Sequence, residues 1–221
     1  MLLAVLAGAA CKVSTNLDQV IALDIGIPNG GQLEFGDTLV PTARALNGRG
    51  DSVAADFIWV SLDTAVLTVL DSTTGETRGD SVAQGRLQAR IGLLRSNTLP
   101  ITVINRIDSL HLAAGAPTRD TVTVSQPDTL SDSLQVQLFG APAASGRRVV
   151  FTASIFPVGG PAVTFVPNDT VLSNATGLAA IQLKVPTGGP APDSVIVTAT
   201  VPRPDGTSVP GSVTFVVEFR P

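Results

Sequence analysis

The chain is poor in the side chains on which most enzymes and metal sites depend. Its 221 residues include one cysteine, one histidine, one tryptophan and no tyrosine. One cysteine excludes a disulfide within the chain, so an exported fold would be stabilised by packing alone. The only histidine, His111, lies in a strand-like segment on the face opposite Leu110 and Leu112, and we interpret it as a solvated strand residue. We therefore predict a protein that is not an enzyme, with no catalytic residues, no metal site and no cofactor.

Positive charge is also scarce. Lysine and arginine total 14 against 18 acidic residues, a net charge of −4, so no basic field would attract nucleic acid and we expect none as a partner. Hydrophobic residues make up 44% of the chain, alongside 21 glycines and 16 prolines. This composition favours apolar strands joined by turns and argues against disorder. The length fits two domains of about 100 residues each.

The single cysteine directly follows a run of apolar and small residues, 1–10. Gly8, Ala9 and Ala10 are small, as a signal peptidase requires, and the run is well short of the ~20 residues that a bilayer span needs. The segment resembles a bacterial lipoprotein signal, in which the cysteine becomes the first mature residue and carries lipid. The resemblance implies a signal at 1–11, lipidation of Cys11 and a domain region held at the cell envelope. Because Lys12 is not the aspartate that retains enterobacterial lipoproteins at the inner membrane, it also implies an outer-membrane location.

The alternative for this segment is a buried apolar N-terminal strand. A free cysteine behaves as a small hydrophobe, and Cys11 would then be incidental.

Beyond this segment, apolar and polar residues alternate with period two almost throughout. Turn-forming residues separate the apolar runs at the 8–12-residue spacing of antiparallel sandwiches, and no helix-length crossover intervenes. A helical stripe of Leu87, Ile91 and Leu94 is an alternative around 85–94, although the alternation is cleaner. The sequence predicts an all-β fold with these strands: 17–27, 38–46, 55–60, 66–70, 85–91, 99–106, 108–112, 120–124, 133–139, 148–156, 162–166, 170–173, 179–185, 194–201 and 212–219.

Two sets of motifs carry a family resemblance. The first half contains Gly36-Asp37-Thr38, Asp51-Ser52-Val53, Trp59-Val60-Ser61, Val69-Leu70-Asp71 and Thr74-Gly75, followed by Gly85 and an alternating strand. It resembles the group 2 bacterial immunoglobulin-like domain, with Trp59 as its core tryptophan. The second half contains Gly146 to Phe151, Asn174 to Ala179 and Val195 to Thr200, and resembles the group 1 domains of invasin- and intimin-type surface proteins. The resemblance implies two tandem immunoglobulin-like antiparallel β-sandwiches, at 12–106 and 107–221, after the N-terminal signal segment.

A few polar motifs are candidate contact sites. Arg-Gly-Asp occurs twice, as Arg49, Gly50 and Asp51 and as Arg78, Gly79 and Asp80, and it resembles an integrin-binding loop. Gly and Asp are, however, the ordinary residues of turns between strands. Arg86 and Arg90 would share one strand face and contact an anionic glycan, or simply keep an outer face soluble.

These observations predict an envelope-anchored structural or adhesive lipoprotein, an immunoglobulin-like spacer whose membrane contact is the N-terminal lipid. The alternative is a module that binds carbohydrate or a protein partner in an envelope complex. No Gly- or Pro-rich linker separates the halves near Asn105 to Ser109, so we expect the two domains to be joined stiffly, end to end.

Overall fold

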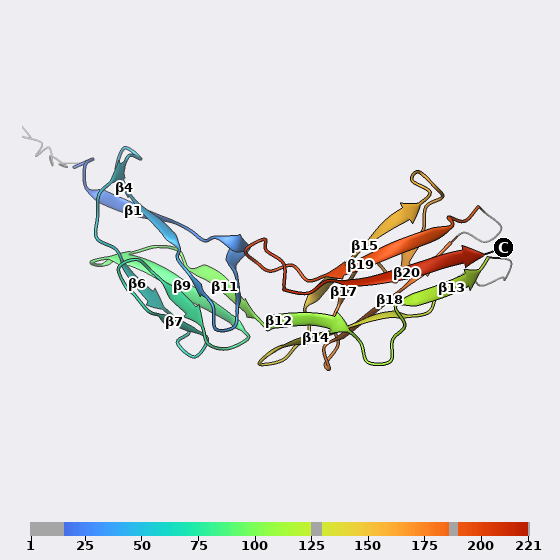
Figure 1. The fold of residues 1–221 in the computed structure, drawn as a ribbon. Coiled ribbons are helices and arrows are strands. Elements are labelled where there is room, and N and C mark those ends of the chain that lie inside the picture. The colour runs from blue at the N-terminus through green and yellow to red at the C-terminus, as the bar shows by residue number, and fades with distance from the viewer. Residues whose placement is uncertain (1–15, 125–129, 186–189, 221) are drawn as a thin grey trace, which may run out of the picture.

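The computed structural model describes residues 16–124, 130–185 and 190–220, and these form β-strands in five sheets (Figure 1). The one helical element in these ranges is a three-residue 3₁₀ turn, η1 (Asn29–Gly31). The prediction of an all-β fold built from two tandem sandwiches is confirmed. The predicted signal segment lies outside the described residues.

The first unit, β1 to β11, contains three sheets. One is a three-stranded sheet with the order β1 (Val20–Gly26), β4 (Thr42–Asn47) and β5 (Ser52–Val53). Another has the order β10 (Leu94–Arg95), β9 (Gln84–Ile91), β11 (Leu99–Ile104) and β2 (Gln32–Glu34), with β6 (Ile58–Ser61) also pairing with β9. The third is β3 (Thr38–Leu39), β8 (Thr77–Gly79) and β7 (Leu67–Val69).

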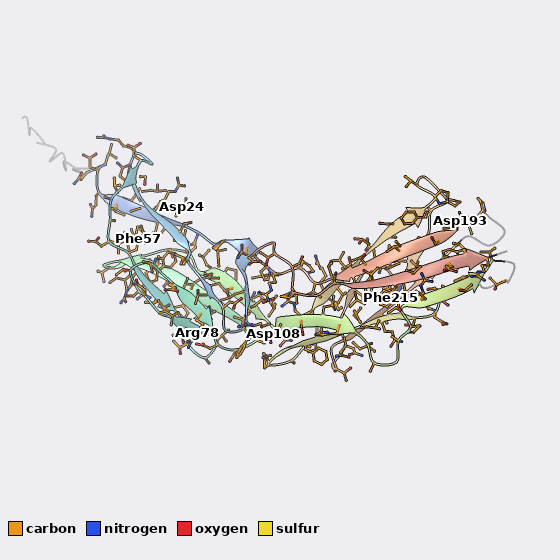
Figure 2. The ribbon with its side chains drawn as sticks, viewed as in Figure 1. Asp24, Phe57, Arg78, Asp108, Asp193 and Phe215 are labelled. Carbon is orange, nitrogen blue, oxygen red and sulfur yellow. The ribbon has the colours of Figure 1, made fainter. Side chains whose placement is uncertain are left out.

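The second unit, β12 to β20, is a two-layer sandwich. One layer has the order β12 (Arg106–Leu112), β14 (Leu134–Ala141), β18 (Leu178–Lys184) and β16 (Thr164–Val166). The other has the order β13 (Arg119–Thr123), β20 (Val213–Arg220), β19 (Ser194–Thr200), β15 (Arg148–Phe156) and β17 (Thr170–Leu172). Figure 2 shows Phe215 in the body of this unit, where its side chain is fully buried.

Each unit has its own hydrophobic core, filled by the side chains that point inward at every second residue of its strands. In the first unit, Trp59, Leu67, Leu87 and Ile101 belong to one buried cluster. Trp59 is 3% exposed, which confirms its prediction as a core residue. Gly75 lies against it at φ +80°, and a Cβ atom on Gly75 would come within 2.8 Å of the indole ring. Only glycine therefore fits this turn without strain.

Several predicted strands are shorter or interrupted. The prediction of one strand over 38–46 was wrong, because Pro41 separates β3 from β4 and cannot donate a ladder hydrogen bond. The strand predicted over 99–106 ends at Ile104, and Arg106 begins the next one. The helical alternative at 85–94 was also wrong, since β9 and β10 occupy that stretch as a hairpin.

Candidate functional site

The most distinctive site lies where the two units meet. β11 ends at Ile104 and β12 begins at Arg106, so Asn105 is the only residue between the two units. The Asn105 side chain donates a hydrogen bond through Nδ2 to the carbonyl of Ser145 in the second unit, at 2.8 Å. The connector is therefore itself fixed to the second unit.

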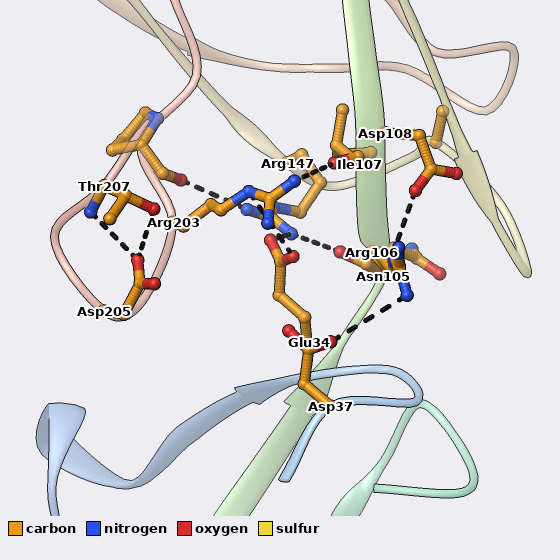
Figure 3. Close-up of polar contacts among 12 residues, drawn as sticks. Glu34, Asp37, Asn105, Arg106, Ile107, Asp108, Arg147, Arg203, Asp205 and Thr207 are labelled. Atoms are coloured by element: carbon orange, nitrogen blue, oxygen red, sulfur yellow. Dashed lines mark hydrogen bonds and ion pairs between the residues drawn. The ribbon is translucent and has the colours of Figure 1, made fainter. Parts of the chain in front are cut away.

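Arg147 lies just before β15 and crosses this boundary (Figure 3). Its Nη1 atom lies 2.5 Å from Oε1 of Glu34, which belongs to β2 of the first unit. The same nitrogen donates to the carbonyl of Asn105, and Nη2 donates to the carbonyl of Pro202 at 3.1 Å. One guanidinium thus binds the first unit, the connector and a loop of the second unit.

Both charges of this pair are buried. The side chain of Arg147 is 4% exposed and that of Glu34 is 1% exposed. Arg203, from the loop between β19 and β20, approaches the same carboxylate, with Nε 4.0 Å from Oε2 of Glu34. Neither of these two atoms has a hydrogen-bond partner within the described part of the chain. We call Glu34, Asn105, Arg147 and Arg203 the junction cluster.

Further polar contacts surround the junction cluster. Arg106 forms an ion pair with Asp108 at 2.9 Å and lies 3.9 Å from Asp37 of the first unit. In the loop after Arg203, hydrogen bonds from Thr207 hold the pKa of the Asp205 carboxyl below its usual range. These hydrogen bonds stabilise the ionised form of Asp205 beside Arg203.

Two hollows flank Arg203 and Pro204 at the junction. One, of about 290 Å³, is lined by Glu34, Asp37 and Asp205, among others. The second, of about 380 Å³, is lined by Arg147 and Arg148. Among the charged side chains that line them, Glu34, Arg147 and Arg203 contact one another and so join the two units. Across residues 16–124, 130–185 and 190–220, no three His, Cys, Asp or Glu side chains are grouped to hold a metal ion.

The two Arg-Gly-Asp sequences differ in structure. Arg49, Gly50 and Asp51 form an exposed turn in which the Asn47 side chain accepts from the backbone of Arg49 and Asp51. In the second copy, Arg78 and Gly79 lie within β8, and a Cβ on the buried Gly79 would meet Val103 at 2.9 Å. Only the first copy is therefore displayed as a turn, and a binding role for either stays a prediction.

Arg86 and Arg90 lie on the exposed face of β9, as the alternation predicts. Arg86 is already neutralised, because its Nε and Nη2 atoms donate to the two carboxylate oxygens of Asp63 at 2.8 and 2.9 Å. The same hydrogen bonds lower the pKa of Asp63 and raise that of Arg86. Arg90 has no such partner among the described residues, so the two arginines do not act as a pair.

His111 is exposed on β12, as expected, and meets the ring of Phe139 edge to face with 5.5 Å between centroids. Cys11 lies outside the described residues. In the part of the chain that the structure describes, no helix has the length and hydrophobicity to cross a membrane.

Sequence reasoning missed the junction cluster. Glu34 stands in a three-residue strand between Leu33 and Phe35, and no local pattern separates a buried carboxylate from a turn residue. The only sequence signal near Arg147 is its adjacency to Arg148, and it lies inside the predicted second domain, far from the predicted boundary at 106 and 107.

The chain shows only distant similarity to known proteins. No protein-family model matches the chain, and no curated protein matches it significantly. Among solved structures, domains 4 and 5 of the S-layer protein SbsC are 15% identical, with a TM-score of 0.33 over 92% of this chain and 100% of that one. The Yersinia pseudotuberculosis adhesin InvE is 16% identical, with a TM-score of 0.39 over 87% of this chain and 58% of that one. The cadherin-like domains 1 to 4 of zebrafish RET are 13% identical, with a TM-score of 0.31 over 74% and 40%.

Proposed function

We propose that this protein is a non-catalytic spacer of the bacterial cell envelope, anchored through lipid on Cys11 and projecting two immunoglobulin-like sandwiches in line. The observation that carries the proposal is the junction cluster. A buried ion pair and a one-residue connector hold the two units end to end, an arrangement that gives reach and a fixed direction. Figure 1 shows the resulting elongated outline.

Small-angle scattering of the chain carrying Cys11→Ser tests the spacer role. A single compact body of this length would have a radius of gyration of about 17 Å, whereas two sandwiches in line extend roughly 60–80 Å at about 3.3 Å per strand residue. We expect a radius of gyration clearly above the compact value. A compact particle with the sandwiches side by side would contradict the spacer role.

The anchor is tested separately with labelled fatty acid. We expect the wild-type chain to take up label and to partition into detergent, and Cys11→Ser to do neither. A well-expressed, full-length wild-type chain without label would refute the anchor while leaving the spacer role open.

A second candidate is a binding module for carbohydrate or a protein partner. It is favoured by a shallow hollow of about 420 Å³ on the outer face of the second unit, lined by His111, Leu112, Gln137 and Phe139. Phe139 is 53% exposed there, and an exposed aromatic ring beside polar groups suits stacking on a sugar. Loss of glycan binding in Phe139→Ala, with unchanged scattering, would support this role.

A further inference from the structure

The hairpin joining β9 to β10 has an unusual tip. Its two-residue loop is Gly92 and Leu93, with Gly92 at φ +56°. Leu93 is 99% exposed, more than any other large apolar side chain that the structure describes. A leucine held fully in water gains no burial energy from the fold, and its whole side chain is accessible to an apolar phase outside the chain.

Two arginines stand directly behind this tip. Arg90 on β9 and Arg95 on β10 are cross-strand partners in the antiparallel register, so both side chains leave the same face. Both are exposed, and no ion pair or side-chain hydrogen bond among the described residues involves either one. Like charges directly opposite each other destabilise a strand pair. An anionic partner outside the chain would remove that cost.

An exposed apolar residue lies beside these two arginines, on the neighbouring strand. Ile58 on β6 is the register partner of Arg90 and is 42% exposed. The surface therefore consists of one apolar tip, Leu93, and a strip of Ile58, Arg90 and Arg95 behind it. We call these four residues the hairpin surface.

The hairpin surface lies at the end of the first unit that is remote from the junction. β11 ends at the junction and β9 runs antiparallel to it, so the end of β9 points the other way. β10 also contacts β1, the first described strand, and Figure 1 shows β1 in the half of the molecule away from the second unit. At this end Asp18 and Asp24 are already paired with Arg49 and Arg44, which leaves Arg90 and Arg95 as cations without a partner.

We propose that the hairpin surface is a second membrane contact, in which Leu93 enters the interface of a bilayer and Arg90 and Arg95 bind the anionic headgroups of its lipids. An apolar tip bordered by cations is what binding to an anionic bilayer requires, because apolar burial and charge attraction add. The proposal takes its orientation from the proposed N-terminal anchor. With a lipid on Cys11, the hairpin would press against the same bilayer and limit tilting of the rod.

Vesicle binding by the full chain carrying Cys11→Ser tests this contact without the lipid. We expect binding to vesicles of phosphatidylcholine with phosphatidylglycerol, weakening as salt is raised, and little binding to phosphatidylcholine alone. Attraction of about 1 kcal/mol per arginine corresponds to about fivefold each, so Arg90→Gln with Arg95→Gln should lower partitioning on the order of 30-fold. Leu93→Ser should lower it about tenfold.

Matched controls come from the second unit. Arg148 is an exposed arginine on β15 and Val158 is 91% exposed in a turn, so Arg148→Gln and Val158→Ser should leave partitioning unchanged. Thermal unfolding checks the fold, and removing either Arg90 or Arg95 should maintain or raise Tm because the repulsion is relieved.

Equal binding to both vesicle types, or equal losses in the control variants, would overturn the proposal. Binding to heparin in the absence of vesicle binding would assign the arginines to an anionic glycan and would overturn it as well. All variants keep the same N-terminal segment and differ only at the hairpin or the control positions, so the differences between them report on the hairpin surface. Scattering reports shape independently, so a failure of the hairpin contact is distinguishable from a failure of the anchor or the spacer role.

Discussion

At the scale of single residues, the stability of the junction depends on Glu34. Its carboxylate is the only acidic group that an ion pair of the described residues brings to Arg147. Removing one partner of a buried pair leaves an uncompensated charge, which costs about 3–5 kcal/mol. We expect Glu34→Ala to lower the free energy of unfolding by about that much in urea denaturation, while the exposed Asp56→Ala changes it by less than about 0.5 kcal/mol.

The double variant Glu34→Leu with Arg147→Met should recover part of this loss, because it removes both charges of the pair but also the hydrogen bonds from Arg147 to the carbonyls of Asn105 and Pro202. Apolar side chains of similar volume often replace a buried ion pair without net cost. A Glu34→Ala chain as stable as wild type would show that the pair is solvated in solution and would remove it as the determinant of the junction.

In the core of the first unit, stability depends on Trp59 as stability at the junction depends on Glu34. With 3% exposure, its replacement by alanine should cost about 3–5 kcal/mol and unfold the first unit. Gly75→Ala should destabilise the same unit, since its Cβ would fall 2.8 Å from the indole at positive φ. Wild-type fluorescence should be blue-shifted and poorly quenched; a red, readily quenched spectrum would place the ring in water.

Asp63 makes part of the stability depend on pH. Its hydrogen bonds from Arg86 lower its pKa in the folded chain. The contribution is therefore fully present above the unfolded pKa of about 3.9 and is lost as pH falls through the lower folded value. Wild type should exceed Asp63→Asn in stability at pH 6, and the difference should shrink below about pH 4. A difference that grows on acidification would contradict this linkage.

At the scale of elements, alternation predicted the long strands well. β15 has the predicted bounds, Arg148–Phe156, because nine alternating residues define one buried face. The short strands β2, β5, β8 and β10 were missed, since they do not stand within a longer run of apolar and β-branched residues as the equally short β7, β16 and β17 do. β2 in addition pairs only with β11, which is distant in sequence.

The same limit explains what was missed in the sites. The shared face of Arg86 and Arg90 follows from period two, but their separation into a paired and an unpaired arginine depends on Asp63, 23 residues before Arg86. The junction cluster likewise joins β2 to a loop more than 100 residues later. Sequence alone predicted that the two domains would meet without a linker, but not which charges would fix their orientation.

At the scale of the whole molecule, the connector and the ion pair together limit bending of one unit relative to the other. One residue between two strands leaves little freedom for the units to swing apart. Arg147 binds both sides of that residue and its carbonyl. Since the pair is buried, dissolved salt should screen it only weakly, so the angle between the units should be insensitive to ionic strength.

Spin labels on the two units measure that angle directly. Ser52 on β5 and Ser154 on β15 are exposed serines, and Ser52→Cys with Ser154→Cys in the Cys11→Ser background gives one label on each unit. We expect a single narrow distance distribution that is unchanged by salt. Inserting Gly-Ser-Gly-Ser after Asn105 should broaden it strongly, because a flexible linker then separates the units, whereas the same insertion after Gly159 should not. A broad distribution in the parent chain would mean that the junction cluster does not hold the units in line, and a spacer of fixed direction would then need a different physical basis.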